Sequence, residues 1–338
     1  MHLLLSLSFL ALTSAVTFPV HNVRRAICTV TSHNDPLKDD VPNIQVALKT
    51  CGDTGTIIFP ANTTFNIGTP LKLSLCKRFQ IQIDGTLRFS NDWTYWQTQT
   101  VGIIIPNVSN AVITSSSIGV IDANGFGWRP NPAPNVPRKM PTLLSIEKGS
   151  SQIYISNLLV RDAPGTVIHV SSDSSAIHFS NIENDRVAKI GYQIQNAQHV
   201  YINNSAIRAS DSCFSIHPNT TNVKMMGLQC STYEETNRPE DGPNAIEMRL
   251  SSDESENWIR NVLIKNVETT GWMNVIGFTD FVATVSGGQW VRASFSTRHR
   301  KHTLTLCLHI IDQHHEREFL RYRFRRRRAK SSMDRQPP

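Results

Sequence analysis

Residues 152–160 read QIYISNLLV, and the same kind of run returns in AIHFSNIEN (176–184), HVYINNSAI (199–207), NVKMMGLQC (222–230) and NVLIKNVET (261–269). The leading apolar residue of these runs advances by 24, 23, 23 and then 39 residues. A short period, alternating Val/Ile/Tyr/Phe and little helical periodicity are typical of a β-solenoid, in which each turn stacks a short parallel strand on the previous one. The longer fourth step leaves room for one inserted loop.

An asparagine stands near the end of four of these runs, at Asn157, Asn181, Asn204 and Asn266. Asparagine tolerates left-handed backbone geometry and can bond neighbouring backbone groups, so we expect it at the corner where each strand turns. A β-sandwich with evenly spaced strands is the alternative. The regular spacing and the recurring asparagine favour an all-β, single-stranded parallel β-helix.

Residues 39–60, DDVPNIQVALKTCGDTGTIIFP, precede the repeats and have a different period. Ile44, Ala47 and Leu48 have helical spacing, and TIIFP then has the character of a strand. We expect a short amphipathic helix to cap the solenoid, because an open coil would expose its core and an unpaired strand edge.

The N-terminus indicates export. Residues 1–15 carry a short apolar run followed by Thr-Ser-Ala, which predicts a cleaved signal peptide and a secreted, extracellular protein. In that compartment the six cysteines are expected to form disulfides rather than metal sites, and no metal or cofactor motif is evident. Four N-x-S/T sequons predict glycosylation, at Asn62, Asn107, Asn203 and Asn219.

The formal net charge of +7 belongs to the C-terminal end. Residues 291–338 hold 13 basic and 4 acidic residues, whereas the rest of the chain holds 21 and 23. The main body is therefore not expected to bind nucleic acid or a membrane. We predict a β-helix domain over 16–287, incomplete at its C-terminal end, and a basic, disordered tail over 288–338. A polyanion-binding arm at Arg325–Arg328 and a shifted reading frame are the alternatives for the tail.

Three stretches resemble glycoside hydrolase family 28, the polygalacturonases: residues 39–60, GVIDANGFGW (119–128) and SDSCFSIHPNTTNV (210–223). The resemblance covers roughly 26–275 and is strongest to fungal exo-polygalacturonases (galacturan 1,4-α-galacturonidases). It implies a right-handed, pectin-lyase-like parallel β-helix. It also implies a monomer that hydrolyses terminal α-1,4-galacturonosyl linkages of pectin or polygalacturonic acid with inversion.

The family's active-site motifs match this chain only in part. By resemblance, Asp211 takes the place of the proton donor in the Asp-Asp-Cys motif, while Ser212 replaces the second aspartate. Ile190 replaces the carboxylate of the Asn-Thr-Asp motif one coil earlier. No histidine follows Cys230 at the place of the Gly-His-Gly motif, and the Arg-Ile-Lys motif is missing after residue 270, so the substrate-binding residues stay unassigned.

The resemblance also pairs Cys213 with Cys230, which would brace adjacent coils beside the site. Cys28 and Cys51 are candidates to bridge the cap, whereas Cys76 and Cys307 have no assignment. His217 is expected on the outer face or lining the cleft, and Glu234 lies close to where the family's histidine would fall.

Inverting hydrolysis needs two carboxyl groups roughly 6.5–9.5 Å apart, one as acid and one as base. Asp211 supplies the first, and neither Ile190 nor Ser212 can supply the second. Three interpretations follow: a polygalacturonase with Asp211 as acid, a non-catalytic pectin-binding relative, and the product of a damaged gene.

Overall fold

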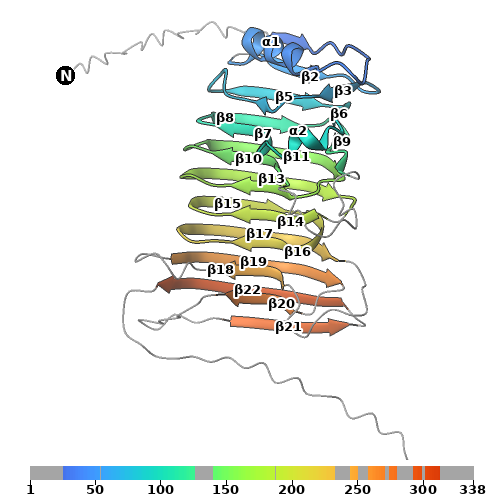
Figure 1. The fold of residues 1–338 in the computed structure, drawn as a ribbon. Helices are drawn as coiled ribbons and strands as arrows, with labels where there is room; N and C mark the ends of the chain where they lie inside the picture. Colours follow the sequence, from blue (N-terminus) through green and yellow to red (C-terminus); the bar gives the residue numbers. More distant parts are fainter. Residues whose placement is uncertain are drawn as a thin grey trace, which may run out of the picture.

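The chain forms a right-handed parallel β-helix, whose coils stack from a helix at one end to the last strands at the other (Figure 1). The computed structural model describes residues 26–53, 55–125, 140–186, 188–232, 244–249, 258–270, 274–279, 292–298 and 301–312. The predicted all-β fold class is therefore confirmed, and the β-sandwich alternative is excluded.

The strands belong to two hydrogen-bonded sheets, which we call sheet A and sheet B. Sheet A contains β1 (Ile27–Thr29), β2 (Thr56–Phe59), β3 (Thr64–Ile67), β5 (Phe79–Ile83), β6 (Thr86–Phe89), β8 (Ser109–Thr114), β9 (Gly119–Asp122), β11 (Ser151–Arg161), β13 (Ser174–Asn184), β15 (Ala197–Asn203), β17 (Thr220–Ser231), β19 (Trp258–Thr270), β21 (Arg292–Arg298) and β22 (Lys301–Asp312). Sheet B contains β4 (Leu71–Lys72), β7 (Val101–Pro106), β10 (Thr142–Glu147), β12 (Thr166–Val170), β14 (Ala188–Ile194), β18 (Asn244–Arg249) and β20 (Asn274–Thr279). Strand β16 (Ala206–Ile216) begins in sheet A and ends in sheet B.

The repeat in the sequence is the register of sheet A. The five leading apolar residues are direct parallel partners in one column: Ile153, Ile177, Val200, Val223 and Val262. Each is buried, with at most 1% of its surface exposed. The step of 39 residues between β17 and β19 keeps this register, so the extra residues do not interrupt the stack.

The recurring asparagines lie at corners, as expected. Asn157, Asn181, Asn204 and Asn266 all have positive φ angles, between 48° and 57°. Two of these asparagines, on adjacent coils, are hydrogen-bonded to each other: Asn181 Nδ2 donates to Asn157 Oδ1 at 3.0 Å. In the coil of β17 this corner position is Gly227, with φ +66°.

A second column of positive φ angles was not foreseen from the sequence. It lies at the start of the same strands and contains Gln152, Ala176, His199, Asn222 and Asn261. Two of its members are asparagine and His is also enriched in this region, but Gln and Ala are not, so residue type does not mark the whole column. The parallel stacking sets the backbone here, and the side chains follow it.

The predicted cap is confirmed as α1 (Val41–Cys51), which covers one end of the solenoid (Figure 1). It buries Ile44, Ala47 and Leu48. Cys28 and Cys51 are disulfide-bonded, which ties β1 to this helix. Cys76 is a buried free thiol beside Gly52, and burial together with the charge of Asp53 raises its pKa to about 11.

Two carboxylates, the buried Asp40 and the half-buried Asp39, anchor the segment that leads into α1. Asp40 is 1% exposed and accepts hydrogen bonds from the backbone N–H groups of His33 and Asn66, at 2.7 and 2.8 Å. Asp39 Oδ1 accepts from the N–H groups of Val41 and Gly68. These contacts fix the entry angle of the helix onto the first coils.

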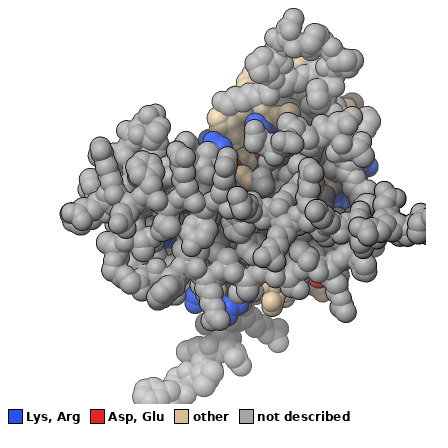
Figure 2. Space-filling view, turned by 90° about the horizontal axis from the view of Figure 1, so that it is seen from below, with Lys and Arg blue, Asp and Glu red and all other residues tan. Residues whose placement is uncertain are grey.

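The other end of the solenoid differs from the expected disordered tail. β22 pairs antiparallel with β19, and β21 pairs antiparallel with β22, so residues 292–298 and 301–312 continue sheet A. Arg325–Arg328 and the predicted signal peptide lie outside the described residues. In the end-on view of Figure 2, the described Lys and Arg side chains that are visible lie at separate places, without forming one basic patch.

A short helix, α2 (Trp93–Trp96), completes the described elements. None of the helices in the described part of the chain is long and apolar enough to cross a membrane.

Candidate active site

Asp211 lies where β16 turns from sheet A into sheet B. Residues 206–208 pair with β17 in sheet A, and residues 209–216 then pair with β14 in sheet B. The register between β14 and β16 shifts by one residue at this corner. The shift presents Asp211 as an exposed side chain, although residues 212–216 that follow it are all buried.

The carboxylate of Asp211 has two polar contacts. The Lys189 ammonium lies 3.8 Å from Oδ2, and the Ser210 hydroxyl donates to Oδ1 at 3.0 Å. Lys189 and Asp211 are 58% and 50% exposed, so solvent screens this pair and it adds little stability. Asp211 therefore remains accessible to a ligand.

Positions 190 and 211 lie on adjacent strands, as the repeat predicted. Ile190 is the direct register partner of Ser212, the residue next to Asp211. Ser212 is only 1% exposed, and its hydroxyl oxygen has no hydrogen-bond partner in the described part of the chain. The two places where the family resemblance calls for carboxylates thus hold a hydrocarbon side chain and a buried hydroxyl.

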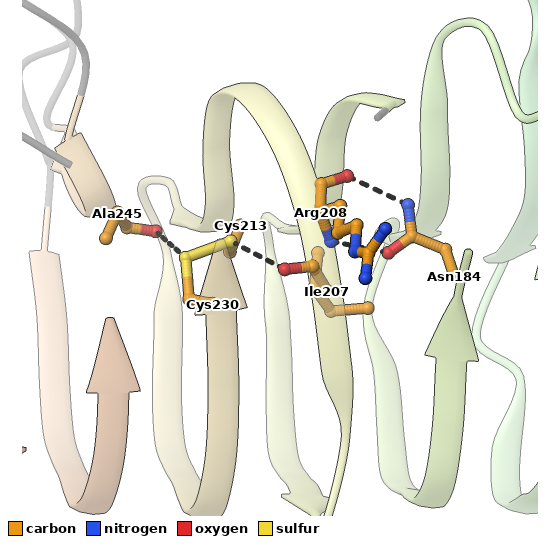
Figure 3. The surroundings of a disulfide bond; sticks show 6 residues. All are labelled: Asn184, Ile207, Arg208, Cys213, Cys230 and Ala245. Carbon is orange, nitrogen blue, oxygen red and sulfur yellow. Dashed lines mark hydrogen bonds between the residues drawn. A yellow bond between two sulfur atoms is a disulfide. The ribbon is translucent and has the colours of Figure 1, made fainter. Parts of the chain in front are cut away.

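The predicted disulfide is present, and it begins at Cys213, two residues after Asp211 in the chain. Cys213 and Cys230 are bonded, and both are buried (Figure 3). The sulfur of Cys213 lies 3.4 Å from the carbonyl oxygen of Ile207, and that of Cys230 lies 3.8 Å from the carbonyl oxygen of Ala245. The disulfide therefore ties the sheet B part of β16 to β17 and contacts β18.

A buried asparagine holds the same corner from the other side (Figure 3). Asn184 Oδ1 accepts from the Arg208 N–H at 2.6 Å, and its Nδ2 donates to the Arg208 carbonyl at 2.8 Å. The same Nδ2 donates to the Arg186 carbonyl at 2.6 Å. Asn184 is 4% exposed and acts as a clamp between the coils of β13 and β16. It holds Arg208, which lies three residues before Asp211.

Charged side chains of alternating sign lie at the C-terminal ends of successive sheet A strands, on the side of the solenoid where this corner lies. Arg88, Asp122 and Arg161 are successive register partners. Ion pairs join Arg88 to Asp122 at 3.7 Å and Arg161 to Asp185 at 3.1 Å. A parallel pair of Arg186 and Asp162 lies beside them at 3.3 Å. Since each cation has an anionic neighbour, this edge is close to neutral.

A second polar group occupies the far ends of the same sheet B strands. His169, Gln193, Ser215 and Glu247 form one register column on β12, β14, β16 and β18. Their chain neighbours are buried core residues, among them Ile168, Val170, Phe214 and Ile216. The column therefore faces away from the core. We use the name sheet B cluster for six residues on this face: Glu147, His169, Ser215, His217, Glu247 and Arg249.

Hydrogen bonds join four members of the sheet B cluster: Ser215, His217, Glu247 and Arg249. Ser215 Oγ lies 2.8 Å from His217 Nε2 and donates to Glu247 Oε2 at 3.4 Å. Arg249 in turn pairs with Glu247 Oε1 at 2.9 Å. His217 thus faces the outside of sheet B, as expected.

Both imidazoles of the sheet B cluster are shifted toward the neutral form. Burial and the Arg249 guanidinium lower the pKa of His217 to about 4, against an opposing effect of Glu247. Burial also lowers the pKa of His169, and Glu147 opposes it. His169 Nε2 is buried and finds no hydrogen-bond partner within the residue ranges that the structure describes.

Sequence reasoning missed most of the sheet B cluster. It singled out His217 and passed over His169, Ser215 and Glu247. The usable signal was a polar residue between apolar ones in three strands of sheet B, at VIHV (167–170), CFSI (213–216) and AIEM (245–248). A polar residue at such a position points outward on a strand whose other face is core.

The other predicted positions have varied surroundings. Asn62 and Asn107 are exposed at turns, whereas Asn203 and Asn219 are half-buried, and their side-chain oxygens have no hydrogen-bond partner among the residues described. Glu234 lies outside the described residues. Within the described ranges, no group of three or more His, Cys, Asp or Glu residues is arranged to hold a metal ion.

The fold and the exposed carboxylate at the entry to sheet B place the chain among parallel β-helix proteins with a candidate site on one sheet face. The profile of glycosyl hydrolases family 28 matches residues 51–233, which is more than half of the chain. This protein belongs to glycosyl hydrolases family 28.

Similar proteins agree with this assignment. A probable endo-xylogalacturonan hydrolase A from Neosartorya fischeri is 32% identical over 240 residues, covering 67% of this chain and 59% of that protein. The endo-xylogalacturonan hydrolase A of Aspergillus tubingensis is 31% identical, covering 73% and 59%. The matched part of the chain thus spans 59% of the length of these curated relatives.

Solved structures show the same fold. The crystal structure of endo-xylogalacturonan hydrolase from Aspergillus tubingensis matches with a TM-score of 0.56 and 25% identity, over 75% of this chain and 72% of that chain. A hyperthermoactive exopolygalacturonase from Thermotoga maritima matches with a TM-score of 0.53, 15% identity, and 72% and 66% coverage. At 15% identity the latter supports the fold alone.

Proposed function

We propose that this chain is a secreted, pectin-degrading glycoside hydrolase that cleaves α-1,4-galacturonan, with Asp211 as the general acid. The observation that carries the proposal is the placement of Asp211. Its carboxylate is exposed at the entry to sheet B, and a disulfide and the Asn184 clamp hold its strand. A general acid must reach the glycosidic oxygen from a fixed position, and this corner provides one.

The chemical role of Asp211 is to protonate the leaving glycosidic oxygen. The inverting mechanism expected from the resemblance also requires a base roughly 6.5–9.5 Å away to deprotonate water. Ile190 and Ser212 cannot act as that base. General-base assistance contributes about 10²–10⁴-fold to the rate, so a chain that lacks it would be slow.

The mode of cleavage has two candidates. The sequence resemblance favours removal of terminal galacturonate residues, whereas the names of the similar fungal proteins favour internal cleavage of a xylose-decorated galacturonan. The sizes of the products separate the two modes, because terminal cleavage releases only monomers at early times.

A second candidate function is binding of pectin without hydrolysis. The specific observation that favours it is the content of the site: Ile190 and Ser212 stand in the carboxylate positions, and Asp211 is paired with Lys189. A chain that holds a galacturonan without cutting it would recognise the polymer through the same face of sheet B.

The test compares the wild-type chain with Asp211→Asn. Release of reducing ends from polygalacturonate and from xylogalacturonan is measured together with calorimetric binding of the same substrates. Asp173→Asn is the matched control, because Asp173 is an exposed aspartate on the turn before β13. The hydrolase proposal expects turnover that only Asp211→Asn abolishes. Binding without turnover in the wild-type chain would select the second candidate, and neither binding nor turnover would reject both.

A further inference from the structure

Lys189 is the cation that meets the Asp211 carboxylate. It lies on β14, one coil before Asp211, and the residue that follows it, Ile190, pairs with Ser212. Its ammonium is 3.8 Å from Asp211 Oδ2. Both side chains are exposed, so a ligand can approach the pair from solvent. The family resemblance does not point to Lys189, because its Arg-Ile-Lys motif belongs after residue 270.

The arginines of the same corner are held by other groups. Arg161 pairs with Asp185 at 3.1 Å, and Arg186 pairs with Asp162 at 3.3 Å. The Arg208 guanidinium donates to the Asp185 carbonyl oxygen at 3.1 Å. These five are the charged side chains that the described coils of β11, β13 and β16 bring to the corner beside the acid and its lysine. The lysine, by contrast, is paired with the acid itself.

The pair of Lys189 and Asp211 is suited to exchange. An exposed ion pair contributes little stability, so little free energy is lost when the ammonium leaves Asp211 for another anion. A general acid must also carry a proton before it can donate one. A protonated Asp211 no longer compensates the charge of the ammonium, so the working state of the acid leaves Lys189 with an uncompensated positive charge.

A galacturonan chain supplies the replacement anion, because each of its residues carries a carboxylate. An ammonium binds a carboxylate as a point charge, through a charge-assisted hydrogen bond. When Lys189 turns to the substrate carboxylate, Asp211 loses a positive neighbour and gains a negative one, and both changes favour its protonated form. Asp211 then takes up a proton from solvent, and this is the proton that it donates to the glycosidic oxygen.

We propose that Lys189 is a substrate-binding residue that exchanges Asp211 for a uronate carboxylate of the bound chain, and that this exchange drives protonation of Asp211. The inference rests on the proposed function for the identity of the polymer and for the role of Asp211. It adds a residue that distinguishes a free uronate from its methyl ester. It also couples recognition of the substrate to the protonation state of the acid, because linkage between two binding events is reciprocal.

The experiment is calorimetric titration of an oligogalacturonate and of its methyl ester into the wild-type chain, Lys189→Met, Lys189→Arg, Asp211→Asn and Lys224→Met. Each titration is repeated in buffers of different ionisation enthalpy, which gives the number of protons taken up. A pH of about 5 suits the measurement, because an ordinary aspartate is still ionised there. The control residue, Lys224, is exposed on β17 of sheet A, with its ammonium 5.5 Å from the centre of the Tyr201 ring.

The wild-type chain is expected to prefer the free acid and to take up protons with it but not with the ester. Lys189→Met should lose about two- to fivefold in affinity for the free acid, the range of an exposed ion pair, and should lose the proton uptake. Lys189→Arg keeps the charge and should keep both. Asp211→Asn should bind the free acid more tightly, because no carboxylate competes for the ammonium, and should take up no proton. Lys224→Met should behave like the wild-type chain.

A merely structural lysine would weaken both ligands alike. That result would overturn the inference, as would a free-acid preference that Lys189→Met retains, or proton uptake that persists in Asp211→Asn, even if the chain hydrolyses galacturonan. Failure of the proposed function looks different: the preference and the proton uptake are present, but no reducing ends appear. If the chain binds neither ligand, the inference is refuted together with galacturonan recognition.

Discussion

Removing the Cys213–Cys230 disulfide should cost stability and also disturb the Asp211 corner. The perturbation is the double variant Cys213→Ala with Cys230→Ala, which leaves small apolar side chains at two buried positions. The bond closes a loop with a sequence separation of 17. Loop-closure entropy for this length corresponds to about 3 kcal/mol of stability at 25 °C.

The second disulfide provides a matched control. Cys28 and Cys51 are separated by 23 residues, so the same relation also gives about 3 kcal/mol. That bond ties β1 to the capping helix α1 at one end of the solenoid, and β16, which carries Asp211, lies many strands further along the stack (Figure 1). The two double variants should therefore lose similar stability but differ in function.

Urea unfolding followed by circular dichroism gives the stability change, and calorimetric binding of oligogalacturonate gives the functional change. Binding is measured at a temperature where all three proteins are folded. The Cys213/Cys230 variant should bind more weakly because residues 207–213 lose their tie to β17. The Cys28/Cys51 variant should bind like the wild-type chain.

Two results would refute this reasoning. A Cys213/Cys230 variant as stable as the wild-type chain would show that the loop is not constrained by the disulfide. Equal loss of binding in both variants would show that the disulfide near Asp211 has no particular role in holding the site.

His217 in the sheet B cluster should make stability depend on pH. Its imidazole takes up a proton near pH 6.5 in the unfolded chain but only near pH 4 in the folded chain. The free energy of unfolding should therefore fall by up to about 3 kcal/mol as the pH is lowered between these values. NMR titration of the His217 ring should show the low pKa, and a value near 6.5 would contradict it. At the corner column, Asn181→Ala should cost about 1 kcal/mol because φ is +53°, whereas Asn181→Gly should be nearly neutral. Thermal unfolding compares the two, and equal losses would show that the lost bond to Asn157 matters more than the backbone. At the cap, Asp40→Asn should cost about 2 kcal/mol, because an amide cannot accept every hydrogen bond that the carboxylate accepts. Unchanged stability in urea unfolding would mean that the segment before α1 is not anchored there.

The fold was readable from the sequence because its determinants are local and repeated. The steps between Ile153, Ile177 and Val200 equal the length of one coil, and the structure pairs these residues directly. Asn181 and its equivalents mark the corners because few residue types adopt a left-handed backbone easily. The helix over 41–51 followed from apolar spacing alone. The column through Ala176 escaped notice, since parallel stacking there imposes a conformation that its side chains do not signal.

The candidate site, like the fold, was predicted from the sequence only in part. The family resemblance supplied Asp211 as a candidate acid and Cys213–Cys230 as a pair, and the structure confirms the disulfide. His169 and Glu247 stand 46 and 32 residues from Ser215 in opposite directions, and no local pattern connects them. Only the stacking of β12, β14, β16 and β18 sets them in one column, because side chains at equivalent positions of successive coils lie one strand spacing apart, whatever their separation in sequence.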